Sequence, residues 1–290
     1  MKVSRGEKIF NIMNIIIMII VIIATLYPFL YLTAISFSSE KYVYAGEITL
    51  LPKGFTMKTY QVLLSEKLFW ISYKNTIVYT LVGTFISLFL STLLAYPLSK
   101  KHLKGRGIIL GLVVFTMFFS GGLIPTYLLV NALGMRNTIW AVVIPGAINT
   151  YYVIVMKTFF EGLPVELEEA AAIDGMNTYG ILLHIVLPLS MPMMAAMTLF
   201  YAVGMWNNWF GPFIYLDKRE LFPAALYLRN IIAGAQQTAV SSGSNIGDLE
   251  QIEATVKSAA MILTALPIIM VYPFLQKYFV KGVMIGSLKG

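Results

Sequence analysis

Residues 9–35 read IFNIMNIIIMIIVIIATLYPFLYLTAI, a run without an acidic, basic or histidine side chain. Five further uncharged runs follow along the 290-residue chain: Asn75–Ser99, Gly107–Met135, Asn137–Met156, Ile185–Leu216 and Ser258–Gln276. A helix needs about 20 apolar residues to cross a bilayer, and each run reaches that length to within one residue. The sequence therefore predicts an all-α integral membrane protein with six transmembrane helices.

The chain is expected to form one transmembrane domain over residues 1–290. We place its spans at about residues 9–35, 75–99, 107–131, 137–157, 190–216 and 258–279. Residues 36–74 and 217–257 are too polar to span and are predicted extracellular loops, serving either as flexible linkers or as surfaces for an external partner. Residues 158–189 form a predicted cytoplasmic segment.

Composition excludes several classes of protein. Hydrophobic residues make up 58% of the chain and charged residues only 12%, against roughly 25% charged in a typical soluble domain. This argues against a soluble enzyme and a disordered chain. The absence of cysteine excludes disulfides, thiolate catalysis and cysteine-ligated zinc, and the two histidines argue against a histidine-built metal site. We therefore predict no catalytic and no metal-binding residues.

The net charge is +7, and the positions of the basic residues indicate how the chain is oriented in the membrane. Short cytoplasmic loops collect Lys and Arg. Basic residues gather in the N-terminal segment, in the loop KKHLKGR after the second span and in the C-terminal tail, whereas the loop after the third span carries only Arg136. Six crossings place both ends on one side, so both termini are predicted to be cytoplasmic.

The apolar runs also lack the groups that usually supply energy to transport. Ion-coupled carriers generally use an ionisable group inside the membrane and show inverted repeats, and we find neither. Backbone carbonyls can bind sodium, so an ion-coupled secondary carrier stays the alternative. No GxxxxGK[ST] phosphate loop is present either. A transporter with these features needs a partner that hydrolyses ATP. An intramembrane enzyme would need paired aspartates, a zinc motif or a serine–histidine pair within the spans, and these are absent.

The cytoplasmic segment contains EGLPVELEEAAAIDG at residues 161–175. Pro164 suits the first position of a helix and Gly175 suits the left-handed residue that ends one, so a helix of about three turns is expected. Between Lys157 and His184 there are five acids, and Lys157 is the one basic residue beside a neutral His184. Such an acidic patch on a basic cytoplasmic face indicates a basic partner, although an ordinary solvated loop would carry the same charges.

The run Glu169–Gly175, followed after nine residues by Ile185-Val186-Leu187-Pro188, resembles the EAA motif of ABC importer permeases. The tail KYFVKGVMIGSLKG and the segments FFSGGLIPTYLLV, FYAVGMWNNWF and LFPAALYLRNII extend the resemblance along the chain. They are similar to carbohydrate-importer permeases related to the six-span maltose permease subunit. The resemblance is greatest to the subgroup that serves complex or acidic oligosaccharide importers of Gram-positive bacteria.

This resemblance implies the type I ABC importer permease fold and a coupling helix that sits in a groove of a cytoplasmic ATPase. The residues implied in this coupling are Glu169, Ala170, Ala171, Asp174, Gly175, Gly286 and Lys289. Glu169 is expected to pair with a basic group of the ATPase, Ala170 and Ala171 to permit close approach, and Gly175 to permit the turn. The C-terminal tail is expected to reach the ATPase interface.

Aromatic and amide side chains bind sugars by stacking and hydrogen bonding. The candidate substrate-path residues are Trp206, Asn207, Asn208 and Trp209 in the fifth span and Asn149, Tyr151 and Tyr152 in the fourth. Hydrogen bonding between helices, or an interfacial tryptophan belt, explains the same residues equally well.

The family resemblance implies a non-catalytic permease subunit in a bacterial plasma membrane that imports a carbohydrate. Its expected partners are a second homologous permease, two copies of an ATPase and an extracellular, lipid-anchored binding protein. ATP and magnesium belong to the ATPase, so this chain is expected to bind no cofactor and no nucleic acid.

Overall fold

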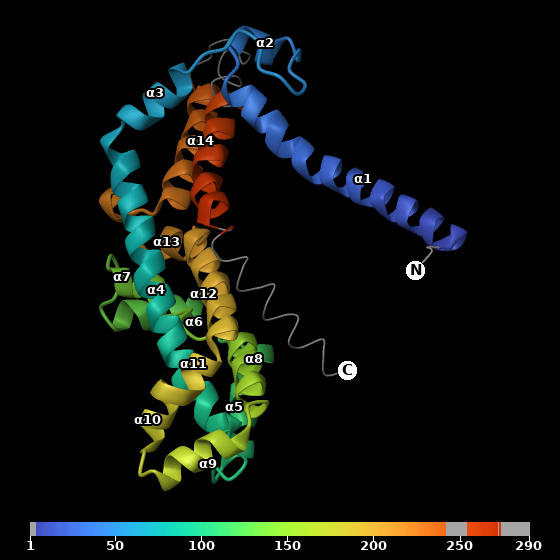
Figure 1. Ribbon diagram of the computed structural model, residues 1–290. Helices are drawn as coiled ribbons and strands as arrows, with labels where there is room; N and C mark the ends of the chain where they lie inside the picture. The colour runs from blue at the N-terminus through green and yellow to red at the C-terminus, as the bar shows by residue number, and fades with distance from the viewer. Residues whose placement is uncertain (1–3, 242–253, 272, 274–290) are drawn as a thin grey trace. The chain divides into compact units, whose positions relative to one another are not determined.

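The computed structural model describes residues 4–241, 254–271 and 273, and every regular element in these ranges is a helix (Figure 1). The prediction of an all-α protein is confirmed. The chain divides into two compact units. The first comprises Met1–Phe69 and Leu228–Pro267, and the second comprises Trp70–Tyr227 and Ile268–Gly290.

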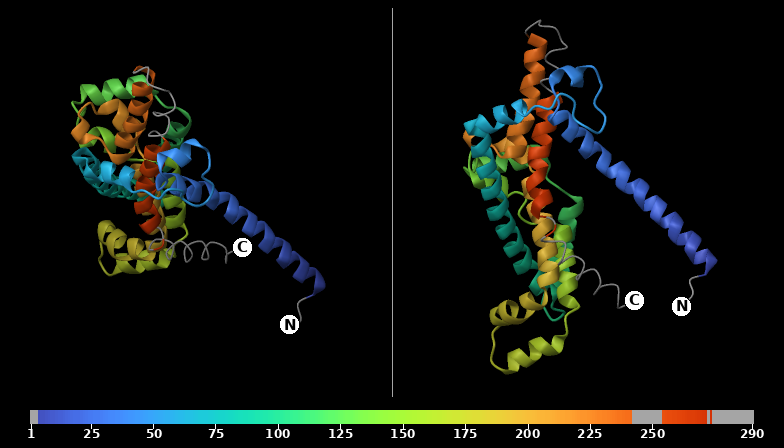
Figure 2. Two further views of the ribbon diagram at one scale, coloured as in Figure 1. Left: turned by 90° about the horizontal axis from the view of Figure 1, so that it is seen from above. Right: turned by 45° about the horizontal axis from the view of Figure 1, so that its top comes forward.

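The first unit begins with the long helix α1 (Arg5–Ser36), which a capping box starts. The Ser4 hydroxyl accepts the Glu7 backbone N–H at 3.2 Å, and the Glu7 carboxylate accepts the Ser4 backbone N–H at 2.7 Å. The most hydrophobic window of α1 has none of its residues buried, and Figures 1 and 2 show the helix extending as a single rod. An uncovered, isoleucine-rich surface of this kind suits lipid or another membrane helix.

The rest of the first unit is a small helical core. Its elements are α2 (Glu40–Tyr44), α3 (Lys58–Ser65), the later part of α14 (Ala224–Ser241) and most of the helix Ala254–Val271. Tyr60 and Leu63 of α3 pack against Ala259. The Tyr60 hydroxyl donates to Ser36 Oγ at 2.9 Å, which ties α3 to the end of α1.

The second unit holds the remaining helices. They are most of α4 (Lys67–Ser99), then α5 (Arg106–Phe118), α6 (Leu123–Ala132), α7 (Ile139–Val143), α8 (Thr150–Glu161), α9 (Val165–Ile173), α10 (Thr178–Ile181), a π-helical turn at Leu182–Val186, α11 (Leu187–Leu189), α12 (Met191–Trp206), α13 (Phe210–Tyr215), a 3₁₀ turn at Arg219–Leu221 and the start of α14. The main core joins α4, α8, α9, α10 and α12 through buried side chains that include Tyr96, Met156, Phe160, Ala171 and Met197.

Three predicted spans are interrupted rather than continuous. The expected span 107–131 divides into α5 and α6, which are bent by 113°, because Gly122 takes φ +85° and ψ 175°, a conformation essentially restricted to glycine. The expected span 137–157 divides into α7 and α8 around Pro145 and Gly146. The expected span 190–216 divides into α12 and α13 at residues 207–209.

Helix boundaries also differ from the predicted span boundaries. α4 begins at Lys67, well before residue 75, since lysines at its polar end are compatible with a helix but not with hydrocarbon. The predicted loop 217–257 contains α14. Three described helices are long and apolar enough to cross a membrane. The number rises to as many as five if two bent pairs each count as one span: α5 with α6, and Thr178–Leu189 with α12, which are bent by 85°. The count of six and the side on which the termini lie stay predictions.

Candidate functional site

Helix α9 has a defined start and stop. It follows Pro164, and it ends where Gly175 takes φ +83°. The Gly175 N–H donates to the Ala172 carbonyl at 3.1 Å, and the Met176 N–H donates to the Ala171 carbonyl at 2.9 Å. These two bonds form a Schellman motif. The helix end predicted at Gly175 is thus confirmed, and α9 with α10 forms a hairpin at one end of its unit (Figures 1 and 2).

The two sides of α9 differ in chemistry. Glu169, Ala170 and Ile173 are exposed, and we call them the outer face of α9; Ile173 is 86% exposed. Asp174 and Gly175 are exposed as well. Ala171, expected at a partner surface, instead lies in the main core at 6% exposure. A helix turns about 100° per residue, and this rotation turns Ala171 into the core while Ala170 stays exposed.

Glu168, the neighbour of Glu169, points toward α4. Its two carboxylate oxygens lie 2.6 and 2.5 Å from Lys100 Nζ, just past the C-terminal end of α4. The Tyr96 hydroxyl donates to Glu168 Oε2 at 3.2 Å, and the Lys100 ammonium lies 4.6 Å from the centre of the Tyr96 ring. We call these three residues the Glu168 clamp.

A second charged group joins the start of α5 to the end of α8. Glu161 accepts from Lys157 Nζ at 2.8 Å and pairs with Arg106, whose Nε donates to the Leu98 carbonyl at 2.8 Å. Burial would raise the pKa of Glu161, but the hydrogen bonds and charges of Lys157 and Arg106 outweigh it and lower that pKa. Two of the five acids in the segment are therefore neutralised internally, and the acidic patch open to a partner is smaller than the sequence indicates.

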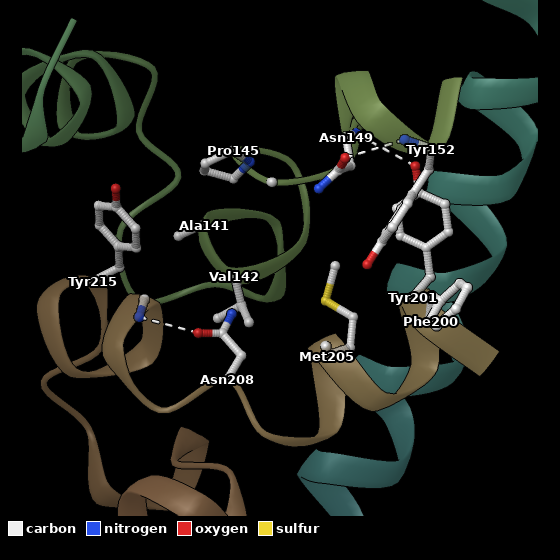
Figure 3. Close-up of a pocket in the computed structure, with 13 residues that line it drawn as sticks. Ala141, Val142, Pro145, Asn149, Tyr152, Phe200, Tyr201, Met205, Asn208 and Tyr215 are labelled. Carbon is white, nitrogen blue, oxygen red and sulfur yellow. Dashed lines mark hydrogen bonds between the residues drawn. The ribbon is translucent and has the colours of Figure 1, made fainter. Parts of the chain in front are cut away.

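A cavity of about 380 Å³ lies in the same unit, within the roughly 300–1,000 Å³ range of ligand pockets. Residues from α7, α8, α12, α13 and the connections between them surround it (Figure 3). The residues that line it are Ala141, Val142, Pro145, Gly146, Asn149, Tyr152, Phe200, Tyr201, Gly204, Met205, Asn208, Gly211 and Tyr215. None of them carries a charge, so this solute pocket is neutral.

Two asparagines shape the polar part of the pocket. The Asn149 side-chain oxygen accepts the Tyr152 N–H at 3.2 Å and caps α8, and the Asn208 side-chain oxygen accepts the Gly211 N–H at 3.2 Å. A backbone N–H can bind only the oxygen of an amide, so these bonds fix both side-chain orientations. Each amide nitrogen is then directed toward the cavity (Figure 3). The pocket thus presents N–H donors to a solute.

The interrupted spans and the pocket coincide. Pro145 and Gly146 lie in the break before α8, and Asn208 lies in the break between α12 and α13. At membrane depth, non-helical backbone is tolerated where it is buried in protein or lines a water-filled cavity. Both breaks in the helices therefore lie beside the cavity.

The structure brings together some of the candidate path residues and separates others. Asn149, Tyr152 and Asn208 line the pocket. The remaining candidates lie elsewhere: Trp206 packs edge-on against Tyr73, Trp209 packs against Phe210 and Phe213, Asn207 is exposed, and Tyr151 is 57% exposed.

Sequence reasoning missed Tyr201, Gly204 and Met205, which also line the pocket. Together with Asn208 they recur at intervals of three and four residues, so a helical-face analysis around Asn208 finds them.

The other residues named from the sequence lie elsewhere. Gly286 and Lys289 lie outside the described residues. The exposed Arg136 pairs with Asp217 at 2.9 Å. The pKa of Asp217 is lowered, first by the hydrogen bond from Asn137 and then by Arg136. Within the described ranges, no group of three or more His, Cys, Asp or Glu residues is placed to hold a metal ion.

Known proteins resemble the chain over nearly its whole length. It is 42% identical to Protein LplC of Bacillus subtilis (strain 168) over 99% of this chain and 97% of that protein. It is 41% identical to YtcP of the same organism, a polygalacturonan/rhamnogalacturonan transport system permease protein, over 91% of this chain and 92% of that one.

A solved structure shares the fold. It is a chain of a bacterial ABC transporter involved in the import of the acidic polysaccharide alginate, with a TM-score of 0.83 and 35% identity. The match covers 95% of this chain and 98% of that one. No protein-family model matches.

Proposed function

Since this chain belongs to the membrane permease subunits of ABC carbohydrate importers, we propose that it conducts an acidic oligosaccharide through the solute pocket. Subunits of this family are integral plasma-membrane proteins without catalytic activity, and ATP hydrolysis takes place on separate chains. The pocket with its two amide donors is the observation that carries the proposal.

Two relatives support an acidic solute. The name of YtcP includes polygalacturonan and rhamnogalacturonan, and the solved structure is that of an alginate importer. The amide N–H groups of Asn149 and Asn208 can donate to hydroxyl or to carboxylate oxygens. Tyr152 adds a ring on which a sugar face can stack and a hydroxyl group. A neutral lining lets an anionic sugar pass without the tight binding that a buried cation would impose.

The outer face of α9 is proposed to dock on the ATPase. Glu169 pairs there with a basic group, and Ala170 lets the two backbones approach closely. Asp174 adds negative charge at the end of the docking surface, and Gly175 provides the turn into α10. Ala171 faces inward, so its small size serves the packing of α9 on its own core rather than the contact with the ATPase.

The proposed complex contains this chain, a second homologous permease, two ATPase copies that hold ATP and magnesium, and an extracellular, lipid-anchored binding protein. The exposed surface of α1 supports a membrane partner. The tail that contains Gly286 and Lys289 is proposed to contact the ATPase. This chain itself holds no cofactor in the proposed mechanism.

The test is uptake by the complex reconstituted in vesicles. We expect ATP-dependent import of oligogalacturonates and little import of neutral maltooligosaccharides of equal length. Glu169→Lys should abolish import, whereas the charge reversal Glu66→Lys, exposed on the predicted extracellular segment, should leave it unchanged. Solute entry without an ATPase, or undiminished import by Glu169→Lys, would refute the proposed mechanism. A preference for neutral glycans would refute the proposed substrate.

A further inference from the structure

We infer that Glu168 is a positioning residue, which clamps α9 to the end of α4 so that the two helices move as one body during transport. The inference rests on the proposed docking of α9 on an ATPase. The clamp and the docking contact are on different faces of α9. The clamp is a contact within this chain, to Lys100 and Tyr96, whereas the docking contact is with the ATPase.

The geometry of the clamp is that of a specific bond. Lys100 reaches both carboxylate oxygens of Glu168, and Tyr96 donates to one of them. Hydrogen bonds between charged groups are stronger and more directional than neutral ones. Two side chains from the end of α4 therefore converge on one carboxylate of α9, although Lys100 and Glu168 are 68 residues apart in the sequence.

Burial separates the clamp from ordinary surface ion pairs. The side chains of Lys100 and Glu168 are 22% and 16% exposed, and Tyr96 is 4% exposed within the main core. Exposed ion pairs contribute little because water and salt screen them. A shielded pair keeps its strength, and removing one partner leaves the other charge uncompensated.

Helix α9 has other attachments besides the clamp. Ala171 packs into the main core, and α9 also contacts α10 and the π-helical turn that follows it. The contacts with α10 and the turn hold α9 to the segment after it, whereas the Glu168 clamp joins α9 to the end of α4. The clamp therefore adds a directional contact between these two helices.

A mechanical role follows from this arrangement. If the ATPase displaces the outer face of α9, the clamp passes the displacement to α4. Rigid-body movement of packed helices is an established form of conformational switching. Without the clamp, α9 can tilt on its own, so ATP is hydrolysed while α4 stays in place.

The experiment measures solute imported per ATP hydrolysed by the whole reconstituted complex. The test variants are Glu168→Gln and Lys100→Gln, and the control is Lys101→Gln, the exposed neighbour in the same loop. We expect the ratio to fall by roughly fivefold or more in the test variants, the lower end of coupling between two sites. ATPase activity and subunit content should stay near those of the control. The swapped double variant Glu168→Lys with Lys100→Glu should recover most of the ratio.

A second measurement tests the clamp if the single variants fail to assemble. The chain contains no cysteine, so Lys100→Cys with Glu168→Cys can be joined by a short, reducible bifunctional thiol reagent. We expect the joined complex to transport, since α9 and α4 stay together throughout.

Three outcomes decide the matter. An unchanged ratio in Glu168→Gln, or a joined complex that stops transport until the reagent is reduced, overturns the clamp and leaves the proposed function standing. Failure of the wild-type chain to assemble with an ATPase overturns the proposed function itself.

Discussion

The hydroxyl group of Tyr201 lies 3.3 Å from the backbone nitrogen of Asn149 and accepts its hydrogen bond. The same hydroxyl lies 2.7 Å from Ser91 Oγ, and it can donate there because an accepted bond leaves its proton free. One side chain of α12 thus holds both the start of α8 and the middle of α4. The bond from Tyr201 therefore positions Asn149, a proposed solute donor, from a neighbouring helix that also lines the pocket.

Tyr201→Phe should loosen that wall. The substitution leaves a buried serine hydroxyl and a backbone N–H without their partner, which costs about 1–3 kcal/mol of folding free energy. We expect a lower thermal stability of the detergent-solubilised chain and a raised KM for solute uptake. Tyr151→Phe, at a tyrosine that is 57% exposed, is the matched control. Equal behaviour of the two variants would show that the Tyr201 bonds do not position the pocket.

Asn208→Asp should discriminate between acidic and neutral solutes. The aspartate keeps an oxygen for the Gly211 N–H, but it replaces the free amide donor with a negative charge inside a neutral pocket. We expect uptake of oligogalacturonate to fall roughly tenfold or more, since like charges at close range repel strongly. Uptake of a neutral analogue of equal length should fall less. Asn207→Asp, at the exposed neighbour, is the control, and equal losses for both solutes would exclude Asn208 from contact with a carboxylate.

Gly83 of α4 reaches the pocket through Met205. A Cβ atom at this position would lie 2.8 Å from Met205 Sδ and 3.0 Å from its Cε. Gly83→Ala should therefore push the thioether from its place in the pocket wall, at a cost of about 1–3 kcal/mol if the core cannot adjust. We expect the KM for uptake to rise, and the additional change Met205→Ala to reverse the rise.

The control for Gly83 is Gly111→Ala in α5, because a Cβ at Gly111 meets nothing within 4 Å. If the Gly83→Ala variant is insensitive to the residue at position 205, the effect is not transmitted through Met205.

The sequence was sufficient for the class of protein and for the ends of α9, because both depend on local properties. Long uncharged runs identify a membrane protein, and Pro164 and Gly175 mark the two ends of a helix. The same absence of charge says nothing about whether the backbone is continuous. Pro145 and Gly122 interrupt helices inside runs that look uniform by composition, so the length of an uncharged run does not give the length of its helix.

The partners of side chains depend on tertiary structure and were less accessible. Glu168 and Glu169 are adjacent and chemically identical, and only the packing of α9 on α4 turns the first inward to Lys100. Ala171 was expected at a partner surface because the sequence does not show which side of α9 packs on the core. Residue type alone selected Asn149 and Asn208, which line the pocket, but also the tryptophans, which pack against other aromatic side chains.

The stability of the region around Glu161 should depend on pH. Lys157 and Arg106 hold its pKa below the ordinary value of 4.5 despite its partial burial. A carboxylate with a lowered pKa in the folded state contributes stability that is fully present above 4.5 and is lost as the pH falls through the lower, folded value. We expect the melting temperature of the solubilised wild-type chain to fall as the pH is lowered below 4.5. Glu161→Gln should have a lower melting temperature than wild type near neutral pH, and this difference should narrow as the solution is acidified.

Glu66→Gln, at an exposed position outside this group, is the control, and its melting temperature should follow that of wild type across the pH range. A constant gap between Glu161→Gln and wild type across this range would show that the ionised carboxylate does not supply the stabilisation.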